Sequence, residues 1–188
     1  MNFKIDIIML GVFLSDERVG IYSFAAFCIE GIYQIFVVLQ NNFNPIIASY
    51  LSSKDKKNLC LFIQKSKKST YIIMIVITLL SIIIYPLLIY YLNINKSLSE
   101  SILPFTILSI GILISSGYIP FNNIFAMANL PSWHSIFMMM NIATNIFLNF
   151  CLIPYYGIVG ASIASSISFI ISAILLKLGT NILLSLKI

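Results

Sequence analysis

The chain is poor in charged residues. Only 9% of its 188 residues are Asp, Glu, Lys or Arg, whereas an ordinary soluble domain has about 25%. Hydrophobic residues make up 60% of the sequence, and the mean hydropathy is +1.00. Because the apolar residues form long runs, this composition excludes a soluble globular domain and indicates an integral membrane protein.

The sequence also has few residues that bind metals or perform catalysis. It has a single histidine, His134, and its three cysteines (Cys28, Cys60 and Cys151) are too scattered for a disulfide framework or a metal-ligand motif. No G-x-S-x-G, H-E-x-x-H, C-x-x-C or phosphate-binding glycine loop occurs. Every polar loop is shorter than about twenty residues, too short for a catalytic domain. We therefore predict no enzyme activity, no metal site and no cofactor.

Six apolar segments of the sequence are expected to be helices in the membrane. The first spans about twelve residues, or about 18 Å at 1.5 Å per residue, which is shorter than the ~30 Å hydrocarbon core. It has the length of the second half of a transmembrane helix. The prediction is an all-α membrane protein whose residues 1–188 form one six-helix transmembrane bundle with a truncated first helix. The expected helices are residues 3–14, 19–51, 70–92, 102–128, 133–153 and 157–178.

The positive charge gathers in one polar segment, residues 52–69, which holds six of the eleven basic residues. We predict that this segment is a basic cytoplasmic loop, with room for a short surface helix. The six-helix topology then places nine basic residues on the cytoplasmic side and two, Arg18 and Lys96, outside. Both termini are predicted to be cytoplasmic. Because topology accounts for the positive charge, we predict no nucleic-acid partner.

A stripe of asparagines marks the helix expected at residues 133–153. Asn141, Asn145 and Asn149 are four residues apart, so their amides lie on nearly one side of a helix. The next helix begins with small residues that allow two backbones to approach closely. Amides facing lipid would cost several kcal/mol each, about 2–7 by transfer measurements, so the stripe must face protein or a water-filled cavity. Two roles remain open, which are hydrogen bonding between helices and lining of a cavity.

Acidic and amide side chains elsewhere supply further candidate residues. Glu30, with Gln34 one turn later, lies near the middle of an expected helix, where an ionisable group normally faces an interior. It is predicted to act as a proton or cation relay or to contact a polar head group, the alternative being a glutamate that only joins helices. Asp6 either has a role in the function of the protein or lies near the membrane–water interface. Asn122 and Asn123 are expected to join the same wall as the asparagine stripe.

Four short patterns carry a resemblance to a known family. They are D-I-I-M-L-G-V-F-L-S at Asp6–Ser15, V-G-I-Y-S at Val19–Ser23, N-P-I-I-A-S at Asn44–Ser49, and N-I-F-L-N-F-C-L-I-P-Y-Y-G-I-V-G-A-S-I-A-S at Asn145–Ser165. In this order and spacing, the chain resembles the carboxy-terminal half of a polysaccharide biosynthesis flippase. Such O-antigen and capsule-unit translocases belong to the multidrug/oligosaccharidyl-lipid/polysaccharide exporter superfamily.

The resemblance implies one half of a twelve-helix exporter with two six-helix bundles. Such a protein would move a lipid-linked oligosaccharide across the bacterial cytoplasmic (inner) membrane, and the six segments here would correspond to its helices seven to twelve. Alternating access requires two bundles around a central site. The implied partner is a separate N-terminal six-helix half or a second copy of this chain.

Three alternatives stay open. In the first, the chain is half of a cation-coupled multidrug antiporter of the same superfamily, with Glu30 as the coupling carboxylate. In the second, it is a fragment of a membrane glycan polymerase or ligase, which the short outer loops disfavour. In the third, it is an inactive gene remnant.

Overall fold

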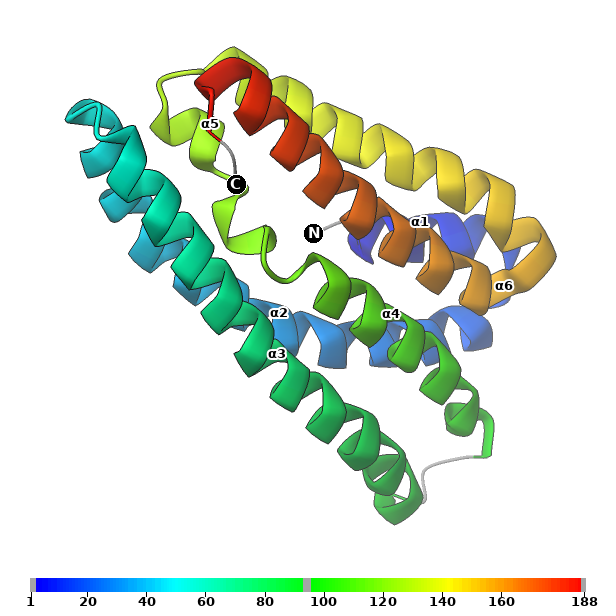
Figure 1. Ribbon diagram of the computed structural model, residues 1–188. Helices are drawn as coiled ribbons and strands as arrows, with labels where there is room; N and C mark the ends of the chain where they lie inside the picture. Colours follow the sequence, from blue (N-terminus) through cyan, green and yellow to red (C-terminus); the bar gives the residue numbers. More distant parts are fainter. Residues whose placement is uncertain (1–2, 93–95, 187–188) are drawn as a thin grey trace.

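The computed structural model describes residues 3–92 and 96–186, and within these ranges every regular element is a helix (Figure 1). Long helices lie side by side, with α3 along one side of the bundle and α6 along the other. The elements are α1 Phe3–Phe13, α2 Asp16–Ser52, α3 Lys56–Leu92, η1 Lys96–Ser101, α4 Ile102–Ser115, η2 Ile119–Phe121, α5 Ile124–Met127 and α6 Pro131–Leu184.

Four of the described helices are long and apolar enough to cross a membrane. Two of them, α2 and α3, have 37 residues each, which at about 1.5 Å per residue exceeds the ~30 Å hydrocarbon core. The chain is therefore an all-α, multi-pass membrane protein, as the composition predicts. The candidate spans are Asp16–Ser52, Lys56–Tyr91, Ser97–Ser115 and Pro131–Leu184.

The longest helix, α6, is a hairpin of two helices. The 54-residue element is interrupted at Gly157, where φ is 56° and ψ is −131°. Residues other than glycine rarely adopt this backbone conformation. The chain reverses there (Figure 1), so residues 131–156 form a first arm and residues 158–184 a second arm. A Cβ atom at Gly160 would clash with the carbonyl group of Leu152. The close approach predicted for this turn is confirmed.

The prediction of a basic loop at residues 52–69 is wrong. Apart from a short turn before Lys56, this segment is the first part of α3. Leu59 and Ile63, four residues apart, are fully buried in an apolar cluster with Ile47 of α2. One apolar face is therefore enough to hold this lysine-rich segment as a helix against the bundle.

The helix predicted for residues 102–128 is interrupted in the structure. Helix α4 ends at Ser115, and η2 and α5 follow it as short pieces. The Tyr71 ring of α3 occupies the space beside Gly117, where a Cβ atom would clash with it, and the Tyr71 hydroxyl donates a hydrogen bond to the Ile114 carbonyl at 3.0 Å. Pro120 in η2 cannot donate a backbone hydrogen bond. Together these features end the helix early.

Packing around α1 positions the candidate site. The Phe3 ring, at the start of α1, meets the Phe169 ring of the second arm edge-on at 6.1 Å. At the other end of α1, Leu14 lies near the hairpin turn at Gly157. Helix α1 therefore lies along only part of the second arm, from about its middle to the turn.

Candidate functional site

The side chain of Asp6 lies fully buried where α1, α2 and the two arms of α6 meet. Its carboxylate accepts three hydrogen bonds. The Tyr22 hydroxyl donates to Oδ2 at 2.8 Å, the Ser165 hydroxyl donates to Oδ2 at 2.5 Å, and the Asn149 amide donates to Oδ1 at 2.6 Å. One donor comes from α2 and one from each arm of α6, so a single carboxylate joins four helical segments.

The asparagine stripe lies between the two arms. The Asn145 amide donates to the Ser165 hydroxyl at 3.1 Å, and the Asn149 amide also donates to Oδ1 of Asn145 at 3.2 Å. Asn145 and Asn149 are fully buried. Asn141 donates to the Ser172 hydroxyl at 2.7 Å. The stripe thus faces protein, and we call Asp6, Tyr22, Asn145, Asn149 and Ser165 the Asp6 network.

The Asp6 network is rich in oxygen atoms and holds no basic residue. All five of its side chains are buried, and Oδ1 of Asn149 has no hydrogen-bond partner among the described residues. A carboxylate surrounded by hydroxyl and amide groups can exchange a proton, and its oxygens are the ligand type that hard cations prefer. In the part of the chain that the structure describes, no group of three His, Cys, Asp or Glu side chains could hold a metal ion.

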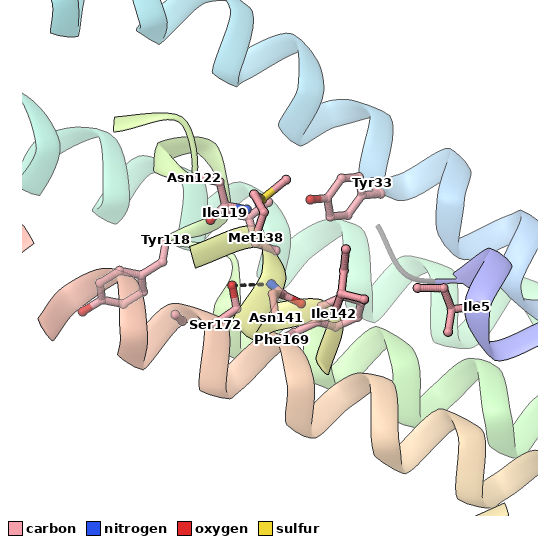
Figure 2. A pocket seen from close by; sticks show the side chains of 11 residues that line it. Ile5, Tyr33, Tyr118, Ile119, Asn122, Met138, Asn141, Ile142, Phe169 and Ser172 are labelled. Atoms are coloured by element: carbon pink, nitrogen blue, oxygen red, sulfur yellow. Dashed lines mark hydrogen bonds between the residues drawn. The ribbon is translucent and has the colours of Figure 1, made fainter. Parts of the chain in front are cut away.

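A cavity of about 260 Å³ adjoins the network where α1 begins (Figure 2). Asn141 and Ser172, joined by their hydrogen bond, line one side of it, and Asn122 of the η2 end lines another. The Tyr33 ring of α2 reaches toward Met138 across the cavity. The asparagines that were predicted to line one surface therefore lie in two places. Asn141 and Asn122 border this cavity, whereas Asn145 and Asn149 belong to the Asp6 network. Ile5, Tyr118, Ile119, Ile142, Phe169 and Ala173 complete the lining.

Glu30 and Gln34 lie apart from both features. They are exposed on the outer face of α2 and line a surface pocket of about 340 Å³. From the sequence, Glu30 is expected to face the interior of the bundle, but its side chain is exposed in this chain. Ile29 and Phe36 occupy the buried face of α2 instead. Asn123 is half-buried and is not among the residues that line the cavity.

Two members of the Asp6 network were missed by sequence reasoning. Tyr22 and Ser165 stand in two of the quoted family patterns, but the sequence analysis assigns a role to neither. A signal for Ser165 exists, because Ser162, Ser165, Ser168 and Ser172 recur every three or four residues in an otherwise apolar helix. Comparisons with protein families, curated proteins and solved structures find no match for the chain.

Proposed function

We propose that this chain is half of a membrane transporter that flips lipid-linked oligosaccharide units across the bacterial cytoplasmic membrane for surface polysaccharide biosynthesis. The observation that carries the transport proposal is the Asp6 network, a buried carboxylate held by Tyr22, Asn149 and Ser165 inside an apolar bundle. The substrate class rests on the resemblance of the four sequence patterns.

The argument from the Asp6 network is energetic. Burying a carboxylate inside an apolar bundle is costly, because the charged group loses its solvation by water. Apolar packing would join α1, α2 and α6 without that cost, so a carboxylate here indicates a function beyond helix association. Because its three donors come from three different segments, movement of any one of them would alter the hydrogen bonding of Asp6. A network of this kind suits a protein that alternates between two arrangements.

The distribution of charge supports a cytoplasmic C-terminal end. Arg18, Glu100 and Gly157 line the same surface pocket, so the hairpin turn lies at the end of the bundle that carries Arg18. At the opposite end, the Lys56 ammonium donates a hydrogen bond to the Leu184 carbonyl at 2.9 Å. With each arm of α6 counted as one crossing, the lysine-rich end is the cytoplasmic one by the positive-inside rule.

The exposed face of α2 supports a second bundle as partner. Ile75, Leu79 and Ile83, on the exposed face of α3, are all apolar, as expected for contact with lipid. On α2, by contrast, Glu30 and Gln34 are exposed in the middle of a helix of membrane length. Such groups face protein or a water-filled space in a finished assembly. A separate six-helix half or a second copy of this chain would supply that surrounding.

In a transporter of two bundles, the candidate path for the oligosaccharide is the exposed α2 face that carries Glu30.

A cation-coupled antiporter half is the second candidate function. The observation that favours it is the same buried carboxylate, so the coupling residue in this version is Asp6 and not Glu30. Asp6 would exchange a proton or a small monovalent cation with one side of the membrane as the bundle changes conformation. Drug accumulation in cells, rather than surface polysaccharide, would then depend on Asp6.

The test is complementation in a bacterium that lacks its own flippase for lipid-linked oligosaccharides. The chain is expressed alone, as a tandem fusion of two copies, and with an N-terminal six-helix half. Surface polysaccharide is measured by immunoblot. We expect export from one of the two-bundle forms and its loss in Asp6→Asn, while the matched control Asp16→Asn, at the exposed start of α2, keeps it. No export from any form, with normal protein levels, contradicts the proposal.

A further inference from the structure

Tyr118 contacts a lysine of α3 and lines a cleft that a lysine of the second arm of α6 also borders. The Lys67 ammonium sits over the Tyr118 ring, 3.7 Å from its centre. Tyr118 also lines a cleft of about 210 Å³ between α4 and the second arm, and Lys177 borders the same cleft. The two lysines are 110 positions apart in the sequence, and their helices, α3 and α6, both pack against α4.

Among the described residues, neither lysine has a carboxylate partner. The single ion pair in residues 3–92 and 96–186 joins Arg18 to Glu100 at the opposite end of the bundle. Lys65 and Lys68 are exposed on the same part of α3 and add further positive charge. Cations near a membrane surface attract anions strongly, at about 1 kcal/mol per Lys or Arg for anionic lipids. The described residues therefore supply no carboxylate to this cleft, and its positive charge suits an anionic ligand.

Apart from Ser115, the other residues that line the cleft are apolar. Ile114 of α4 is 50% exposed and Ile174 of the second arm is 52% exposed, and Ile170 lies one turn before Ile174 in the same wall. The cleft thus combines a cationic end with an exposed apolar track. A free phosphate ion would use only the first of these, whereas a lipid would use both.

We infer that this cleft binds the phosphate group of a membrane lipid, with Lys67 and Lys177 as its cationic contacts and the isoleucine track against its hydrocarbon chain. The Tyr118 hydroxyl can donate a hydrogen bond to the same group. The inference does not depend on the proposed transport function. The phosphate group is shared by two sources, a phospholipid of the cytoplasmic leaflet and a polyprenyl diphosphate carrier.

Lipid binding to the purified full chain in detergent tests the inference by native mass spectrometry. The probes are dioleoylphosphatidylglycerol, a polyprenyl diphosphate, dioleoylglycerol without phosphate, and inorganic diphosphate as competitor. We expect one lipid to bind through its phosphate group, and the Lys67→Gln/Lys177→Gln variant to bind roughly thirtyfold more weakly. The control Lys54→Gln/Lys57→Gln removes the same charge from exposed positions of the same end and should change binding less than about twofold.

Two results of the binding experiment would overturn the inference. They are an equal loss of lipid affinity in both double variants and binding of dioleoylglycerol as strong as that of the phosphate-bearing lipids, because either result means that no defined phosphate contact exists. Rescue by Lys67→Arg/Lys177→Arg supports it, since the charge is kept. Preference for the polyprenyl diphosphate identifies a carrier lipid, and equal binding of phosphatidylglycerol identifies a general anionic-lipid site. Displacement by inorganic diphosphate alone, with no lipid retained, contradicts the role of the apolar track. Loss of export in the Asp6→Asn variant with lipid binding intact separates this result from the transport test.

Discussion

Asp6 and Glu30 are both acidic residues within long apolar helical segments, yet the bundle places them in opposite surroundings. Asp6 is fully buried and accepts three hydrogen bonds. Glu30 is exposed on α2 and has no hydrogen-bond or ion-pair partner among the described residues. The difference comes from the helix face. A carboxylate that the fold satisfies is part of this chain's own structure, whereas one that the fold leaves exposed in the membrane indicates a surface completed by something else.

The first test of this difference removes each carboxylate in a separate variant. In Asp6→Leu, the Tyr22, Asn149 and Ser165 donors lose their acceptor, and each unsatisfied buried group costs about 1–3 kcal/mol. We expect a large fall in the thermal unfolding midpoint, measured by circular dichroism at 222 nm in detergent. Glu30→Leu should leave the midpoint unchanged, because no partner in the chain is lost. Equal midpoints for the two variants would contradict the assigned difference.

The second test leaves Asp6 in place and removes its asparagine neighbours. In Asn145→Leu/Asn149→Leu, three hydrogen bonds that the two amides donate are lost, one of them to Asp6. Such bonds average about 0.6 kcal/mol each in membrane proteins. We expect a smaller fall in the unfolding midpoint than in Asp6→Leu, with membrane insertion retained. The control Ile142→Leu/Ile146→Leu, on exposed positions of the same arm, should have no effect. A fall larger than that of Asp6→Leu would mean that the asparagines, not the carboxylate, organise the network.

The hairpin of α6 shows how much of this site the sequence predicts. Spacing by four residues predicts that Asn141, Asn145 and Asn149 lie on one side of a helix, and the small residues at the start of the next helix predict a close approach of two backbones. Both are properties of one continuous segment, so local periodicity was sufficient. The pairing of that stripe with serines of the second arm follows from the turn itself.

The partner of the stripe was not predictable in the same way. Asp6 meets Ser165 across 159 positions of sequence, and no local pattern specifies which face of α1 packs into the hairpin. The exposure of Glu30 could not be predicted for the same reason. Both faces of α2 carry large apolar residues, such as exposed Phe27 and buried Phe36, so hydrophobicity alone did not distinguish the outer face from the inner one.

A third carboxylate, Glu100, separates the effect of pairing from the effect of burial, because it has an ion-pair partner but is exposed. It forms an ion pair with Arg18, and both side chains are about half exposed, at 47% and 50%. Exposed ion pairs contribute only about 0–1 kcal/mol. Arg18→Ala should therefore lower the unfolding midpoint by a few degrees at most, and the small difference should vanish in 1 M salt. A fall comparable to that of Asp6→Leu would show that pairing, and not burial, separates Asp6 from Glu30.

The smallest effect on stability is expected for Glu30→Gln, which is also the sharpest test of what covers α2. The substitution keeps the size of the side chain and removes its charge, and no contact within the chain depends on that charge. We expect the same unfolding midpoint as the unaltered chain when it is measured alone. In complementation with a second bundle, by contrast, surface polysaccharide should fall, because Glu30 would then face the path between two bundles. The matched control is Glu17→Gln, at the exposed start of the same helix, which should export normally. Normal export by Glu30→Gln at equal protein levels would mean that the polar face of α2 has no part in transport, and that Asp6 is the only carboxylate of the two with a function.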